Sequence, residues 1–378
     1  MNYINNSVIA KKSPQKRGVK EKLLPAVLSI LVFAMILCLI TNSQRFFEST
    51  KRGFMLFANS VFPGLFPFLV LTKILTDLGC VTKITNKLNP LTKRVFGLSG
   101  EAGYIFLMSA LCGYPCGAKL TADLIKSGAI EKKETTRILS FCAVSGPIFA
   151  IGTVGGAMFG SVKIGVFLYV CHIVSALICG LIFCNIGRHR HSRRDCAPSP
   201  TSQVSLKKAI TSPQSPCQHL SSPQPPSFNS SLSAPRRPDD ILGASVYSAV
   251  STILTVGAFI TLFYLLIDMV LFSHITAPIE AAIGFVLTLC GAPKNVASGV
   301  VCGIFEMTRG CFELSRIGRV WGVALTGGLL SFSGLSIMAQ SLALLGGTGV
   351  SVWRFFLQKI VHALLCTGLC LIFSFIIF

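Results

Sequence analysis

Long stretches of apolar residues constrain the fold of this chain more than any other feature. A helix needs about 20 such residues to cross the hydrocarbon core of a bilayer. Stretches of this kind cover residues 23–40, 53–76, 100–117, 138–159, 164–186, 242–272, 281–307, 320–345 and 355–378. Only 13% of the residues are charged and the mean hydropathy is +0.68, so the chain cannot cover a water-facing surface. The sequence predicts an all-α polytopic membrane protein of the cell membrane.

Half of the net charge of +20 lies in two segments. Residues 1–22 hold six bases and one acid, and residues 188–240 hold eight bases and three acids. Basic segments beside membrane spans stay on the cytoplasmic side, so we expect both segments to be cytoplasmic. The chain has neither zinc-finger spacing nor a platform of aromatic and basic residues, and we therefore expect no nucleic-acid partner.

A change of composition divides the membrane part of the chain. Residues 192–238 contain nine of the 18 prolines together with twelve serines, which is typical of a disordered linker. The predicted organisation is a basic tail (1–22), an anchor transmembrane helix (23–42), a first membrane repeat (43–187), a basic Ser/Pro-rich linker (188–241) and a second membrane repeat (242–378).

Features that recur at a nearly constant distance indicate that the two membrane segments are repeats of each other. Internal duplication of this kind is common in membrane transport folds. The matching residues are His172 with His362 and Gly113 with Gly303, both 190 positions apart, and Ser145 with Ser333, 188 apart.

The basic loops bear on the orientation of the repeats. Loops 77–99 and 119–137 are both basic, and both are cytoplasmic if residues 100–117 form a re-entrant segment. The Gly- and Pro-rich residues 112–117 suit such a segment, because re-entrant backbone must be satisfied by protein or water. This count favours inverted repeats, but it places Arg309, Arg316 and Arg319 outside, so both orientations stay open.

Ionisable residues and helix breaks inside apolar stretches suggest a binding site. Glu306, Arg309 and Glu313 share one helix face and can pair there, either as a salt-bridged helix end or as a polar cavity wall. Lys119 and Asp123 form a second pair of this spacing. The candidate substrate-binding residues are Gly113, Pro115, Lys119, Asp123, Ser145, Pro147, Glu306, Arg309, Ser333 and Gln340.

Several other features have simpler explanations. We interpret His172 and His362 as neutral hydrogen-bonding partners and the 15 cysteines as small buried side chains. Residues Gly152, Gly156 and Gly160 recur every four positions, which predicts a helix-packing stripe. The chain contains no phosphate loop, zinc helix or nucleophile elbow, so we expect no cofactor, no metal site and no enzymatic activity.

Four stretches together resemble one family: residues 62–68 (FPGLFPF), 113–121 (GYPCGAKLT), 303–306 (GIFE) and 332–340 (FSGLSIMAQ). The chain is similar here to the YlbJ-type sporulation integral membrane proteins, within the wider nucleoside-recognition or Gate group. The likeness covers roughly residues 20–187 and 242–373. The resemblance implies two Gate-like repeats and a role in building the spore envelope, especially its cortex. The chain departs from the Gate-containing ferrous iron transporter B by lacking a GTPase domain, and Cys116 stands where a small residue is expected.

These observations lead to two functional hypotheses. In the first, the protein is a permease-like carrier of a small polar solute, such as a nucleoside, that is needed for the spore envelope. In the second, it is a non-transporting membrane scaffold that recruits spore-envelope enzymes through its linker. The lipid bilayer is the expected partner in both, and the sequence leaves open whether a second copy of the chain or spore-envelope proteins bind as well.

Overall fold

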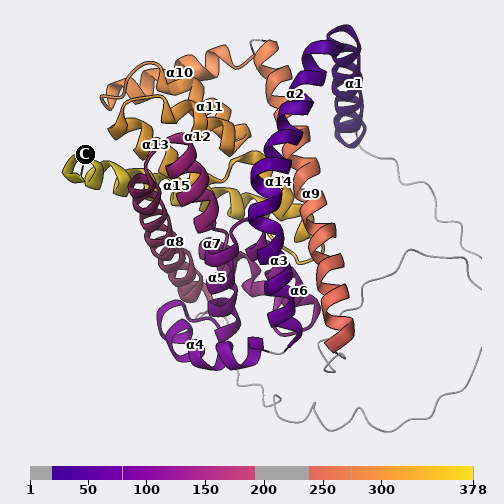
Figure 1. Ribbon diagram of the computed structural model, residues 1–378, viewed down its shortest axis with the longest axis vertical. Coiled ribbons are helices and arrows are strands. Elements are labelled where there is room, and N and C mark those ends of the chain that lie inside the picture. Colours follow the sequence, from indigo (N-terminus) through magenta and orange to yellow (C-terminus); the bar gives the residue numbers. More distant parts are fainter. Residues whose placement is uncertain (1–18, 79, 192–237, 274, 378) are drawn as a thin grey trace, which may run out of the picture. The chain divides into compact units, whose positions relative to one another are not determined.

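The structure is a computed structural model that describes residues 19–78, 80–191, 238–273 and 275–377. Within these ranges the regular secondary structure is entirely helical (Figure 1). Residues 1–18 of the predicted tail and residues 192–237 of the predicted linker lie outside the described part. The chain divides into two compact units, residues 1–49 and residues 50–378, and each is described by itself.

The first unit contains helix α1 (Val19–Thr41) and the beginning of α2 (Ser43–Leu56). Helix α1 coincides with the predicted anchor, and its 23 residues extend over about 35 Å, enough to cross a bilayer. Large apolar side chains are exposed along it, including Ile30, Phe33 and Ile40. Such a surface is stable in contact with lipid, as expected of a transmembrane anchor.

The second unit holds the remainder of the described helices. The elements before the predicted linker are η1 (Phe57–Val61), α3 (Phe62–Asp77), α4 (Cys80–Phe96), α5 (Gly100–Cys112), α6 (Cys116–Lys126), η2 (Lys132–Glu134), α7 (Thr135–Cys142), η3 (Ile148–Met158) and α8 (Val162–His191). The elements after it are α9 (Pro238–Phe272), α10 (Ala277–Leu289), α11 (Val296–Phe305), α12 (Met307–Ser315), α13 (Arg319–Phe332), α14 (Gly334–Leu344) and α15 (Val352–Ile377).

Several of these helices are long and apolar enough to cross a membrane. Four candidate spans lie at Val162–Asn185, Ile241–Phe272, Val320–Leu344 and Val352–Ser374 within the described residues, and there are up to six if two bent helix pairs each count as one span. The Val320–Leu344 window is 83% buried, against 33–39% for the other three. This span therefore lies at the centre of the bundle, shielded from lipid by the others, and the prediction of a polytopic helical membrane protein is confirmed.

The two halves of the second unit repeat one order of elements. Helices α5 and α6 form a short hairpin, α7 and η3 form a broken helix, and α8 is long; α11 to α15 follow in the same order. The first helices of the hairpins have 13 and 10 residues, about 20 and 15 Å, so neither hairpin crosses the bilayer. Helices α4 and α10, which precede the hairpins, lie at opposite ends of the bundle (Figure 1). This is the arrangement of inverted repeats.

Two details of the predicted repeat are wrong. Residues 281–307 do not form one span, because Gly291, with φ of +85°, and Pro293 separate α10 from α11. Gly303 does not match the break at Gly113, because it lies inside α11. The break falls at Glu306, whose side chain accepts hydrogen bonds from the first backbone N–H groups of α12 and so starts a new helix there.

The main hydrophobic core is shared between the halves. Its buried side chains come from η3 and α8 of the first half and from α11, α12, α13 and α15 of the second, and they include Val154, Leu168, Cys311, Leu330 and Cys366. The predicted glycine stripe is wrong. A Cβ at Gly152 or Gly160 would meet nothing within 4 Å, whereas Gly155 lies against Gly165. The segment is a π-helix, so residues four apart do not share a face as they do in an α-helix.

Candidate functional site

The two helix breaks of the first half cross in direct backbone contact. Gly113 ends α5 with φ of +81°, and a Cβ built on it would lie 2.4 Å from the backbone nitrogen of Gly146. Gly146 belongs to the break between α7 and η3. Only glycine combines this backbone conformation with so close an approach, so Gly113 fixes the point where the two breaks meet.

The second half contains the same crossing. Ser333 separates α13 from α14 with φ of +70°, a left-handed conformation that costs a non-glycine residue about 1–2 kcal/mol. A Cβ on the next residue, Gly334, would lie 3.0 Å from the nitrogen of Met307. The break between α13 and α14 therefore lies on the break between α11 and α12, and each half presents crossed helix ends to the interior.

A cavity lies where these breaks face each other. About 90 Å³ of it is accessible to the centre of a water molecule, enough for several waters. Apolar side chains of η1, α3 and α9 form one wall, among them Val61, Phe68 and Val256. The opposite wall carries the polar groups Gly113, Tyr114, Ser145, Gly146, Glu306, Thr308 and Gln340. Four of the candidate residues, Gly113, Ser145, Glu306 and Gln340, thus line one cavity.

Glu306 is the ionisable group of this polar wall, and its side chain is fully enclosed, with the residue only 2% exposed. Its Oε1 accepts a hydrogen bond from the backbone N–H of Thr308 at 3.1 Å, and its Oε2 accepts one from that of Arg309 at 2.7 Å. A carboxylate has about four acceptor positions, so both oxygens keep capacity for donors of a ligand. The N-terminus of α12 favours the negative charge.

The guanidinium of Arg309 forms no ion pair with Glu306 among the described contacts, so the interpretation of this helix face as a salt-bridged helix end is not supported. This guanidinium donates to Asp268 of α9, which also accepts from Arg52 at 2.9 Å. The sequence interpretation did not single out Asp268. A signal was present, because Asp268 is the only acid in the apolar stretch 242–272, and isolated charges in spans are functional candidates.

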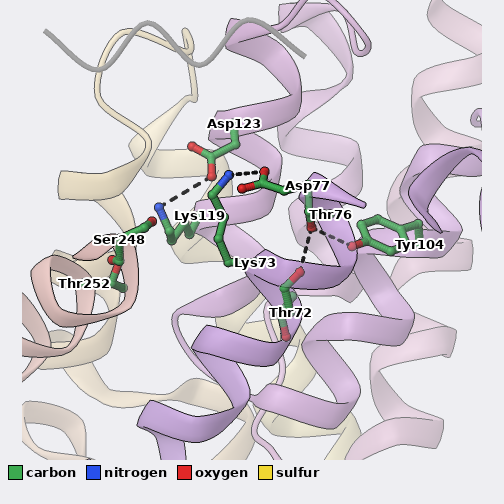
Figure 2. A network of polar contacts seen from close by, with 9 residues as sticks. All are labelled: Thr72, Lys73, Thr76, Asp77, Tyr104, Lys119, Asp123, Ser248 and Thr252. Carbon is green, nitrogen blue, oxygen red and sulfur yellow. Dashed lines mark hydrogen bonds and ion pairs between the residues drawn. The ribbon is translucent and has the colours of Figure 1, made fainter. Parts of the chain in front are cut away.

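Lys119 and Asp123 pair with each other at 3.5 Å, outside the cavity lining. Figure 2 shows them in a polar network with Lys73 and Asp77, which pair at 2.5 Å on α3. Lys73 lies five residues after Phe68, and Lys119 lies five residues after Tyr114; both Phe68 and Tyr114 line the cavity. The helical rise places the network about 8 Å beyond the cavity.

The other candidate residues shape the breaks without lining the cavity. Pro115 precedes α6 and Pro147 precedes η3, while Ser333 forms the left-handed turn. Within the described ranges, no group of three or more His, Cys, Asp or Glu residues could hold a metal ion.

A buried polar cluster stands behind the polar wall. The backbone N–H of Ser145 donates to Nε2 of His172 at 2.8 Å, and Nδ1 of His172 lies 2.8 Å from Oγ of Ser331. The rings of His172 and His362 stack with centroids 4.9 Å apart. A ring nitrogen that accepts from a backbone N–H carries no proton, so the geometry fits the predicted neutral hydrogen-bonding role of His172. Lys359 of α15, which the sequence interpretation did not select, joins the cluster by donating to the carbonyl of Ser331 at 3.4 Å.

The fold defines a helical integral membrane protein. It contains a Gate domain, because residues 58–164 match the Gate family, described as nucleoside recognition. This match includes the cavity residues Gly113 and Ser145. The sporulation integral membrane protein YlbJ of Bacillus subtilis (strain 168) is 30% identical over 329 residues, which cover 85% of this chain and 76% of that protein. The chain belongs to the YlbJ family. No solved structure matches it.

Proposed function

We propose that the protein is a permease-like carrier of a nucleoside or a related small polar metabolite. One observation carries this proposal: a cavity lies where helix breaks from two inverted repeats meet, and the breaks at Gly113, Gly146 and Glu306 line it. Transporters bind solutes in such positions, since broken helices offer backbone groups and helix dipoles near the membrane midplane. The match to a family described as nucleoside recognition supports the choice of solute.

The chemistry of the cavity suits a nucleoside. The Glu306 carboxylate has free acceptor positions for two neighbouring sugar hydroxyls, as carboxylates have in other nucleotide sites. The amide of Gln340, which donates to Ser336 at 3.2 Å, offers both a donor and an acceptor to the edge of a base. Phe68 and Phe149 supply aromatic surface for stacking.

Binding of labelled nucleosides to the purified full-length protein tests the proposal. At least one nucleoside should bind saturably, and Glu306→Gln should weaken it tenfold or more, because an amide oxygen replaces one charged acceptor. Glu313→Gln, on the same helix but outside the cavity lining, is the matched control and should bind as the unchanged protein does. Reconstituted vesicles should then take up the bound nucleoside. Failure of a nucleoside panel to bind, or equal binding by both variants, would refute this assignment.

We also propose that the N-terminus and the linker face the cytoplasm. Arg137 supports this orientation: its guanidinium donates to the carbonyl of Phe96 at 3.1 Å and reaches the carbonyl of Cys184 at 3.5 Å. The basic helix α4, the basic segment before α7 and the end of α8 therefore lie at one end of the unit, and basic segments favour the cytoplasm. Protease sites inserted at residues 192–237 should be cut in inverted vesicles and resist cleavage in intact cells.

The name of the Bacillus subtilis relative supports a role in sporulation, which we propose for this chain together with a contribution to the spore cortex. Deleting the gene in its host should reduce the yield of spores with a complete cortex. The Glu306→Gln variant, produced at the normal level, should fail to restore that yield. Full restoration by this variant would separate the sporulation role from the cavity.

A further inference from the structure

Among the residues that the structure describes, Lys359 is a cation buried inside the bundle without an acidic partner. The residue is 2% exposed, and none of the ion pairs found among the described residues involves it. A charge in such a place is expensive unless polar groups surround it. Its surroundings therefore indicate what the side chain does.

Three oxygens satisfy the three donors of an ammonium group. Nζ of Lys359 donates to the carbonyl of Ala143 at 2.6 Å, to the hydroxyl oxygen of Tyr114 at 3.0 Å and to the carbonyl of Ser331 at 3.4 Å. The Tyr114 hydroxyl donates its own hydrogen to the carbonyl of Leu330 at 3.1 Å, so its oxygen is an acceptor for Lys359. An ammonium has three donors and no acceptor, which is what this set of partners requires.

The two carbonyls belong to the C-terminal ends of the broken helices. Ala143 follows the last residue of α7, and Ser331 lies in the last turn of α13. Helix C-termini carry partial negative charge, and half-helix C-terminal ends with unwound carbonyls are where transporters coordinate their coupling ions. Tyr114 also lines the cavity, so the ammonium lies directly behind the polar wall.

The two repeats carry different residues at this position. The residue 190 positions before Lys359 is Tyr169, the same offset that relates His172 to His362. The hydroxyl of Tyr169 donates to the carbonyl of Ala110 at 2.7 Å. One repeat thus has a neutral donor where the other places a cation on the helix ends.

We propose that the Lys359 ammonium is a built-in cation, filling a site at the ends of α7 and α13 that would otherwise bind a small monovalent cation such as sodium. The protein then needs no dissolved sodium to hold its broken helices together. Shortening the side chain leaves the carbonyls exposed to each other and opens the site to an ion or to a small alkylammonium. This inference goes beyond the proposed function, and its test requires no solute.

The test measures thermal unfolding of the purified full-length protein in sodium chloride, ethylammonium chloride or choline chloride at equal ionic strength. The unchanged protein should melt at one temperature in all three salts. Lys359→Ala should melt lower in choline, and sodium or ethylammonium should restore its stability in a saturable way, because ions that bind the folded state stabilise it. Lys73→Ala is the control, since Lys73 pairs with Asp77 and should show no specific response.

Each alternative result would overturn the proposal. One is an equal response of Lys359→Ala to all three salts. A second is a specific requirement of the unchanged protein for sodium. A third is failure of Lys359→Ala to fold even in sodium and in ethylammonium, since both should fill the vacated site. Because no nucleoside is present, these outcomes do not depend on whether the protein transports one.

Discussion

Replacing Gly113 by alanine tests the crossed helix breaks most directly. The new Cβ would face two separate penalties. The first is the backbone conformation, since φ of +81° with ψ of −166° is a combination that essentially only glycine adopts, and it costs alanine about 1–3 kcal/mol. The second is steric, because the Cβ would lie 2.4 Å from the nitrogen of Gly146, and overpacking typically costs about 1–3 kcal/mol. The combined loss of stability should be about 2–6 kcal/mol.

Two other glycines separate these penalties. Gly160 also has a positive φ, +64°, but a Cβ there would meet nothing within 4 Å, so Gly160→Ala should cost only about 1–2 kcal/mol. Gly152 has neither problem, and Gly152→Ala should be neutral or stabilising by up to about 1 kcal/mol.

Denaturant unfolding of the three variants in one detergent, followed by tryptophan fluorescence and circular dichroism, would rank their free energies. The expected order of loss is Gly113→Ala, then Gly160→Ala, then Gly152→Ala. Nucleoside binding should fall only in the first variant, because only its substitution displaces the cavity wall. If Gly113→Ala costs no more than Gly160→Ala, the two breaks are not in contact and the reasoning fails.

Three further predictions follow from single contacts. Asp268→Asn should destabilise the protein by about 1–3 kcal/mol in denaturant unfolding, because it leaves the half-buried Arg309 without its partner. Arg52→Ala, at the exposed end of the same cluster, should cost under about 1 kcal/mol, and equal losses in the two variants would contradict this prediction. Ser333→Gly should raise stability by up to about 1 kcal/mol in the same assay by relieving the left-handed backbone, and a loss would show that the hydroxyl contributes more. Deleting residues 192–237 should leave nucleoside binding within twofold, since loop length affects stability weakly; loss of spore formation with binding intact would favour the scaffold hypothesis.

Four of the nine apolar stretches, 164–186, 242–272, 320–345 and 355–378, coincide with candidate spans, because the length needed to cross a bilayer sets a strong limit on sequence. Stretches 53–76, 138–159 and 281–307 do not form single spans, because each is interrupted by a π-helix or a helix break. They did not predict where a span breaks when the breaking residue works through its side chain. Glu306 begins α12 by accepting backbone hydrogen bonds, and neither glycine nor proline marks that position. The glycine in close helix contact was also predicted wrongly. The prediction assumed α-helical spacing and selected Gly152, but Ile148–Met158 is a π-helix, in which Gly155 packs against α8.

The candidate site was predicted in part for a similar reason. Residues at helix breaks, such as Gly113 and Ser145, carry a local signal, and the structure brings them to one cavity. Lys359 and Asp268 carry only the weaker signal of a single charge in an apolar stretch. Their partners lie 216 and 41 residues away, at Ala143 and Arg309, and sequence spacing on one helix does not reveal such contacts.

The position of the cavity along α3 has a consequence for how a solute would leave the protein. Because the cavity ends at Phe68 on α3, five residues before Lys73, the layer between the cavity and the polar network of Figure 2 is only about one and a half helical turns thick. A modest tilt of α3 or α9 would breach so thin a partition. Exchange with that side of the membrane would then demand a local shift of one helix, leaving the shared core between the halves undisturbed.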